Sequence, residues 1–258
     1  MKLNHVFAAM VPGFLLITTS LMAQADSSGE QSLDLVTDRP DQTESSVVVP
    51  PGYFQLETGW GVTRTGEENT HEFPSTLLRI GVIRSVELRV GYKGHVWETG
   101  EAVPQRENGD LGAKFHLWPE GGWIPDAGLL ISVSLPRQAD PAIRLALSHS
   151  LTERVSFSYN LGAAWESEPD GDQDMDRLSV FQYTATLGIG LSDQTGAFME
   201  VFGDLPLSAA GGPEHLLDGG LTHLLRDNLQ LDAFAGIGLS QDAEDWFVGL
   251  GVTLRLPQ

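Results

Sequence analysis

The chain of 258 residues contains no cysteine. It therefore cannot form a disulfide framework, a thiolate zinc site or a cysteine nucleophile. Basic residues are also scarce, with 15 Lys and Arg against 35 Asp and Glu, which gives a formal net charge of −20. This balance excludes the basic stripe that contact with nucleic-acid phosphates requires, so no nucleic-acid partner is predicted.

Long apolar runs are missing except at the N-terminus. Lys2 precedes a mostly apolar stretch from Val6 to Met22, and the small-x-small site Ala23-Gln24-Ala25 follows. This is the three-part pattern of a secretory signal peptide, so residues 1–25 are predicted to direct export. After Ala25 no run approaches the roughly 18 apolar residues of a membrane helix. The mature chain is therefore expected to be either a soluble protein or an outer-membrane β-barrel.

Alternation of period two runs through the rest of the chain. In segment 155–166 the odd positions are mostly large and apolar, and the even positions are mostly small or polar. Such alternation indicates strands with one apolar and one polar face. About twelve strands are predicted, at 52–64, 71–83, 86–98, 108–118, 127–136, 141–151, 155–166, 177–191, 197–207, 214–225, 229–240 and 246–256.

The connections between these strands alternate between short turns and longer polar loops, which is typical of an up-and-down outer-membrane barrel. Four tryptophans fall toward the loops and two toward the turns, like the two aromatic girdles of a membrane barrel; they are Trp60, Trp97, Trp165 and Trp246, then Trp118 and Trp123. The predicted fold class is all-β, an antiparallel up-and-down transmembrane β-barrel of about 12 strands over residues 52–258. A soluble β-sandwich or a lipocalin-like barrel is the alternative, because it would alternate in the same way.

A polar motif precedes the first predicted strand. It reads Thr37-Asp38-Arg39-Pro40-Asp41-Gln42-Thr43-Glu44-Ser45, and a P-x-G-x-x-Q-x-E strand follows from Pro50 to Glu57. The motif resembles the opening of a bacterial outer-membrane transporter-like family, the meta-pathway of phenol degradation family. The resemblance implies an outer-membrane barrel in a Gram-negative bacterium that passes small compounds, aromatic ones among them. It implies no catalytic residue.

Residues 26–51 form a polar, proline-interrupted lead that cannot be a transmembrane strand. One interpretation is a periplasmic tail. The other is a lumen plug, in which Asp38, Arg39, Asp41 and Glu44 meet charges inside the barrel, where a charged residue avoids lipid.

Extending the inward parity through each strand predicts a charged lumen. Basic residues dominate the early strands and acidic residues the later ones, which would set a transverse field that orders dipolar or zwitterionic solutes. The alternative is that these charges pair across a narrow barrel and fill it. The predicted pore-lining residues are Glu57, Arg79, Glu87, Arg89, Lys93, Lys114, Arg144, Glu166, Glu200, Asp204, Asp218, Asp232 and Arg255. Strand 197–207 has ambiguous parity, because Phe198 and Phe202 share a face with Glu200 and Asp204.

The sequence predicts no enzyme, no metal site and no cofactor. The seven histidines show no H-x-H or H-E-x-x-H spacing, and there is neither a G-x-S-x-G elbow nor a P-loop. The acidic loop 166–176 could gather Ca²⁺, but it lacks the EF-hand pattern, so a solvated surface loop is favoured. His149 beside Ser148 is interpreted as an interface histidine rather than part of a hydrolase.

The predicted function is passive passage of small solutes through an outer-membrane channel, with membrane lipid and a small-molecule solute as partners. A second hypothesis is a plugged structural or binding barrel that acts through its surface loops. An outer-membrane enzyme is the third. The sequence carries no signal for the identity of the solute or for an oligomeric state.

Overall fold

The computed structural model describes residues 34–98, 109–135, 140–167, 177–207 and 212–258, apart from the side chains of Glu166, Ser167 and Arg177. The predicted signal peptide and residues 168–176 of the acidic loop lie outside these ranges. Within them, no helix has the length and apolarity needed to cross a bilayer.

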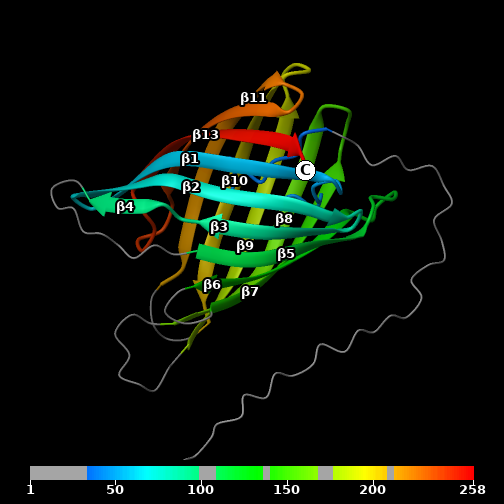
Figure 1. Cartoon of the computed structure of the whole chain (residues 1–258). Coiled ribbons are helices and arrows are strands. Elements are labelled where there is room, and N and C mark those ends of the chain that lie inside the picture. The colour runs from blue at the N-terminus through cyan, green and yellow to red at the C-terminus, as the bar shows by residue number, and fades with distance from the viewer. Residues whose placement is uncertain (1–33, 99–108, 136–139, 168–176, 208–211) are drawn as a thin grey trace, which may run out of the picture. The chain divides into compact units, whose positions relative to one another are not determined.

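The described residues form one antiparallel sheet that closes on itself. Its strands are β1 (Tyr53–Thr65), β2 (Glu68–Ile83), β3 (Val86–Tyr92), β4 (His95–Glu98), β5 (Gly109–Trp118), β6 (Asp126–Leu135), β7 (Asp140–Ser150), β8 (Val155–Ser167), β9 (Arg177–Gly190), β10 (Thr195–Pro206), β11 (Glu214–Arg226), β12 (Leu229–Gly238) and β13 (Trp246–Pro257). β1 pairs with both β2 and β13, which closes the barrel. Figure 1 shows the last strand, in red, beside the first. The predicted fold class is confirmed.

The third predicted strand, 86–98, is interrupted in the structure. β3 and β4 both pair with β2, so together they occupy one of twelve positions around the barrel. The break falls at Gly94, whose φ of +82° is the left-handed conformation that favours glycine. Lys93 lies in this break and is exposed. The alternation that places Lys93 in the lumen ends at Tyr92, so the inward direction of Lys93 stays a prediction.

Charged side chains lie inside the barrel and apolar side chains lie outside, which is the reverse of the arrangement in a soluble protein. The largest fully buried side chains include Arg79, Lys114 and Glu57, whereas large apolar residues such as Met199 and Leu250 are exposed. Strict alternation explains this reversal, since successive side chains of a strand point to opposite faces of the sheet. An exposed apolar belt around a polar interior is what a lipid-facing barrel requires.

Two ends of the barrel can be distinguished by their connections. We call the end with the short turns 84–85 and 227–228 the turn mouth, and the end with segment 239–245 the loop mouth. β1 therefore runs from the turn mouth at Tyr53 to the loop mouth at Thr65. The exposed Trp118 and Trp123 lie near the turn mouth, and the exposed Trp97, Trp165 and Trp246 lie near the loop mouth, as two girdles would require.

Candidate functional site

Residues 34–50, which we call the lumen segment, make hydrogen bonds to inward-facing side chains of the barrel. Both ends of the segment lie toward the turn mouth. The Asp34 carbonyl accepts a hydrogen bond of 2.9 Å from Arg255, near the end of β13, and the Val49 amide donates one of 2.7 Å to Glu87, near the start of β3. Between these ends, Arg39 reaches farther along the barrel, to the carbonyl of Leu250.

Asp38 is the centre of an ion cluster with the early strands. We call Arg79 of β2, Arg89 of β3 and Lys114 of β5 the basic wall. One carboxylate oxygen of Asp38, Oδ2, lies 3.0 Å from Arg79, 2.6 Å from Arg89 and 2.7 Å from Lys114. The other, Oδ1, accepts hydrogen bonds from the Ser45 amide and hydroxyl. Asp38 and Ser45 lie in the first and second halves of the lumen segment, which we call its two arms. Through Asp38, both arms are therefore held against the basic wall.

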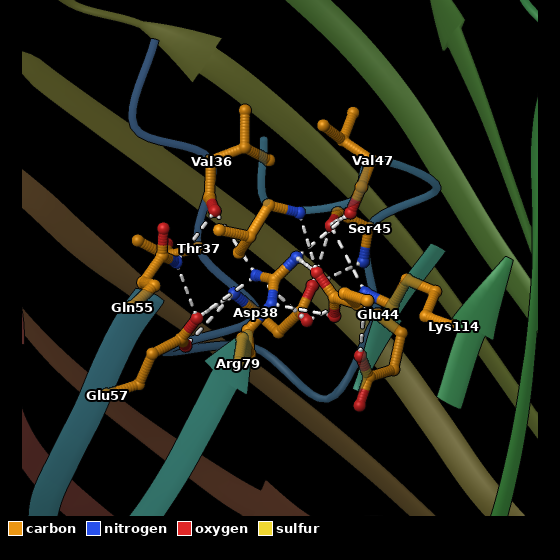
Figure 2. Close-up of polar contacts among 12 residues, drawn as sticks. Val36, Thr37, Asp38, Glu44, Ser45, Val47, Gln55, Glu57, Arg79 and Lys114 are labelled. Carbon is orange, nitrogen blue, oxygen red and sulfur yellow. Dashed lines mark hydrogen bonds and ion pairs between the residues drawn. The ribbon is translucent and has the colours of Figure 1, made fainter. Parts of the chain in front are cut away.

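Arg79 joins the cluster to the backbone of the lumen segment (Figure 2). Its guanidinium pairs with Glu57 at 3.1 Å and Glu87 at 2.9 Å, and it donates hydrogen bonds to the carbonyls of Val36 and Val47. These two carbonyls belong to the two arms of the segment. Because the side chain is fully buried, its donors can be satisfied only by protein groups or enclosed water.

Glu44 supplies the second carboxylate from the lumen segment to the basic wall. It lies 2.8 Å from Arg89 and 3.2 Å from Lys114. Burial alone raises the pKa of Asp38, but the positive charges of Arg79, Lys114 and Arg89 outweigh it and hold that pKa well below its ordinary value. Asp38 is therefore ionised at neutral pH, and ion pairs hold the lumen segment to the basic wall.

The opposite side of the lumen is acidic and holds the segment differently. We call Glu200 of β10, Asp218 of β11 and Asp232 of β12 the acidic wall. Glu200 accepts hydrogen bonds from the Gln42 amide, at 2.7 Å, and from the Thr43 hydroxyl. The donors that the lumen segment gives to Glu200 are therefore neutral groups.

Arg39 makes the one ion pair that we find between the described lumen segment and the acidic wall. Its Nη2 lies 3.3 Å from Asp232, and its guanidinium carbon lies 5.8 Å from the ring centre of Phe234. Gly59 and Gly251 are register partners on β1 and β13, and a side chain at either would collide with the guanidinium. The paired glycines therefore form a slot for Arg39 in the barrel wall.

Asp41 faces the acidic wall, and no described Lys, Arg or His forms an ion pair with it. Burial, reinforced by the negative charges of Glu200 and Asp218, raises the pKa of Asp41 well above its ordinary value. Asp38 and Asp41 are three residues apart, yet their pKa values shift in opposite directions, because cations surround Asp38 whereas burial dominates at Asp41.

The lumen segment separates two cavities. One, of about 430 Å³, lies toward the loop mouth and is bordered by Thr63, Glu72 and Phe247. The other, of about 500 Å³, lies toward the turn mouth and is bordered by Ser156 and Gly190. Arg39, Pro40 and Asp41 line both cavities, so these three residues stand between them.

The predicted pore-lining residues can now be placed. Eight of them are buried on the inward face, namely Glu57, Arg79, Glu87, Arg89, Lys114, Glu200, Asp218 and Asp232. Arg255 is also buried and donates to Gln55 at 2.8 Å. Arg144 and Asp204 are half-buried and share Gln182 as a hydrogen-bond partner. The side chain of Glu166 lies outside the described part of the chain. In β10, Phe198, Glu200, Phe202 and Asp204 share one face, and Glu200 shows that it is the inward one.

Sequence reasoning missed several neutral partners of the lumen segment. Asn160 of β8 exchanges two hydrogen bonds with the Glu44 backbone, and Thr184 and Thr186 of β9 contact the Thr43 hydroxyl. All three occupy polar positions of their alternating strands. Their inward direction can therefore be read from the alternation, but a neutral polar side chain does not by itself indicate contact with the lumen segment.

The described residues carry no group of three or more His, Cys, Asp or Glu side chains that could hold a metal ion. His149 stacks against Tyr159, with ring centres 6.3 Å apart, and lies 3.9 Å from Glu120. Its neighbour Ser148 is hydrogen-bonded to Ser158 instead. Adjacent strand residues point to opposite faces, so the two side chains do not form a nucleophile–base pair.

The closed barrel and its charged lumen define a protein of the outer-membrane barrel class. The family described as "Putative MetA-pathway of phenol degradation" matches residues 37–256, and the chain belongs to that family. This confirms the resemblance that the T-D-R-P-D-x-T-E-S motif suggested.

Comparison with solved structures agrees with this class. The NanC porin is similar with a TM-score of 0.60 and 10% sequence identity, over 78% of this chain and 100% of that one. The KdgM porin has a TM-score of 0.56 and 8% identity, over 78% and 98% of the two chains. At these identities the likeness shows the fold. No curated protein matches this sequence.

Proposed function

We propose that this protein is an outer-membrane channel for the passive passage of small solutes, and that the lumen segment limits that passage. The observation that carries the proposal is the pair of cavities separated by Arg39, Pro40 and Asp41. A closed barrel of twelve strand positions is wider than the eight-stranded barrels that side chains fill, so it can hold both a segment and solvent-sized space.

The rest of the proposal concerns location, partners and chemistry. The exposed apolar belt would contact membrane lipid, and the predicted signal peptide would deliver the chain for insertion. The name of the family makes aromatic compounds the first solutes to test. The role is transport without catalysis, with the inward charges setting solute selectivity.

A second candidate is a barrel held shut by its own segment, which acts as a binding or structural protein. The observation that favours it is the buried ion cluster of Asp38 and Glu44 with the basic wall, which is expensive to break once formed. Ionic current distinguishes this candidate from the channel.

The test is single-channel conductance of the full chain in planar bilayers. The double variant Asp38→Asn with Glu44→Gln removes both carboxylates that the lumen segment gives to the basic wall. We expect a small conductance for the natural chain, and a larger or more frequent open state for the variant, because the segment is then held less firmly. The matched control is Glu67→Gln with Glu68→Gln, which removes the same charge from exposed residues at the loop mouth.

Slower or faster migration of the unheated protein in a detergent gel would report that each variant is folded as a barrel. If both proteins are folded and neither passes current, the channel proposal is overturned and the shut barrel is favoured. If the variant conducts no better than the natural chain, the lumen segment does not limit passage.

A further inference from the structure

The acidic wall also carries aromatic rings. Phe198 and Phe202 of β10 share the inward face of Glu200, and Phe234 of β12 shares the inward face of Asp232. Phe247 of β13 lies 6.0 Å from Phe202 and 6.1 Å from Phe234, between ring centres. Three of the rings line the cavity at the loop mouth, and Phe198 lines the cavity at the turn mouth. We call these four rings the aromatic strip; they border both cavities on this side.

Glycines opposite the rings make room for them. Phe198 pairs in register with Gly220, and Phe247 pairs with Gly236. A side chain at either glycine would collide with the ring beside it, so each ring lies across the backbone of the neighbouring strand.

The acidic wall also holds a carboxyl group that accepts no N–H or O–H donor from the described residues. Asp218 is the register partner of Glu200, and only 4% of its surface is exposed. Among the described residues, neither of its carboxylate oxygens has a hydrogen-bond partner. Asp218 therefore adds a buried acceptor to this wall, directly beside Glu200.

Arg39 shows which ligand chemistry this wall accepts. Its planar cation lies against the Phe234 ring and pairs with Asp232, with the Leu250 carbonyl as a further acceptor at 3.4 Å. A flat cation between an aromatic ring and a carboxylate gains both from the ring quadrupole and from the charge pair. The chain thus places a ligand of its own on the strip, at the point where the two cavities meet.

We propose that the acidic wall and its four phenylalanines form a binding site for small planar organic cations, of the guanidinium and aromatic amidinium class, for which Arg39 is an internal competitor. The proposal deepens the proposed function, since the site would select solutes on the route through the barrel. Aromatic carboxylates are disfavoured at this site, because Asp232, the partner of Arg39, accepts hydrogen bonds from a cation and offers none to a carboxylate.

The test is equilibrium binding of benzamidinium to the folded full chain in detergent, measured by calorimetry, with benzoate as the probe of equal size and opposite charge. We expect benzamidinium to bind and benzoate not to bind. Arg39→Ala should tighten benzamidinium binding about tenfold, because the competitor no longer occupies the strip. The control Arg84→Ala removes an exposed cation at the turn mouth and should leave the affinity unchanged.

Two further variants test the strip itself. Phe234→Leu should weaken benzamidinium binding by about threefold to tenfold, the worth of one cation–π contact. Asp218→Asn should weaken it as well, and either variant alone keeps the test informative if the other fails to fold. Equal binding of benzoate and benzamidinium, or unchanged affinity in Arg39→Ala, would overturn the proposal.

This measurement is independent of conductance. If benzamidinium binds as expected and no variant passes current, the site stands and the channel function fails. If current flows and benzamidinium does not bind, the channel stands and the cation site fails.

Discussion

The two walls of the lumen hold the same segment by different physical means. The basic wall pairs three buried cations with Asp38 and Glu44, so its contacts are charge against charge. The acidic wall receives the Gln42 amide and the Thr43 hydroxyl. The lumen segment also gives this wall one cation, Arg39, and 19% of that side chain is accessible.

These two kinds of contact indicate where the lumen segment is anchored and where it can be displaced. Separating the basic wall from Asp38 would strand several buried charges, whereas water or a solute can replace the neutral donors on the acidic wall. We therefore expect that any opening begins on the acidic side, where Arg39 and Asp41 stand between the cavities.

The largest effect is expected from Arg79→Met, which removes one of the three cations of the basic wall. The change leaves Asp38, Glu57 and Glu87 without their shared cation and should cost about 3–5 kcal/mol of unfolding free energy. Urea unfolding in lipid vesicles, followed by tryptophan fluorescence, measures the loss. Glu200→Gln is the counterpart on the other wall and should cost about 1 kcal/mol, because the amide oxygen can still accept. Equal losses in the two variants would contradict the distinction between the walls.

An intermediate effect is expected from pH. The folded pKa of Asp38 is lowered, so its stabilising contribution is present above the ordinary value near 3.8 and is lost as the pH falls through the lower folded pKa. The folded pKa of Asp41 is raised, so its contribution is present below 3.8 and is lost as the pH rises through the higher folded pKa. The lumen segment should therefore be held most firmly at mildly acidic pH.

Hydrogen–deuterium exchange of the Gln42, Ser45 and Val49 amides, corrected for the intrinsic pH dependence of exchange, measures this effect. Asp41→Asn should abolish the gain in protection on mild acidification. Asp38→Asn should abolish the loss of protection in strong acid. Protection that rises steadily toward alkaline pH would show that the sign assigned to Asp41 is wrong.

An effect well below that of Arg79→Met is expected from Thr43→Val, which changes the acidic side alone. The variant removes a hydroxyl that contacts Glu200, Thr184 and Thr186, and should cost about 1–2 kcal/mol. Thermal unfolding measures the change, and Thr65→Val at the exposed end of β1 provides a control of the same chemistry. A loss as large as that of Arg79→Met would contradict a weakly held acidic side.

Much of the barrel could be predicted from the sequence, because alternation is a local property of each strand. The predicted span 155–166 corresponds to β8, and 246–256 corresponds to β13, within one residue at each end. The interruption at Gly94 could not be predicted, because a single glycine inside an alternating run does not by itself indicate a positive φ. The parity of β10 was undecided, because Phe198 and Glu200 suit different faces when read alone.

The barrel class and the family motif can be predicted from the order of residues in the chain, and so can an inward face for most of the charged side chains. How the motif is used depends on contacts between segments that are far apart in the sequence. Asp38 meets Lys114 from 76 positions away and Arg39 meets Asp232 from 193 away, and no local pattern encodes such distances. Closure of the barrel brings the early and late strands around one lumen, so the two walls exist only once β1 has paired with β13.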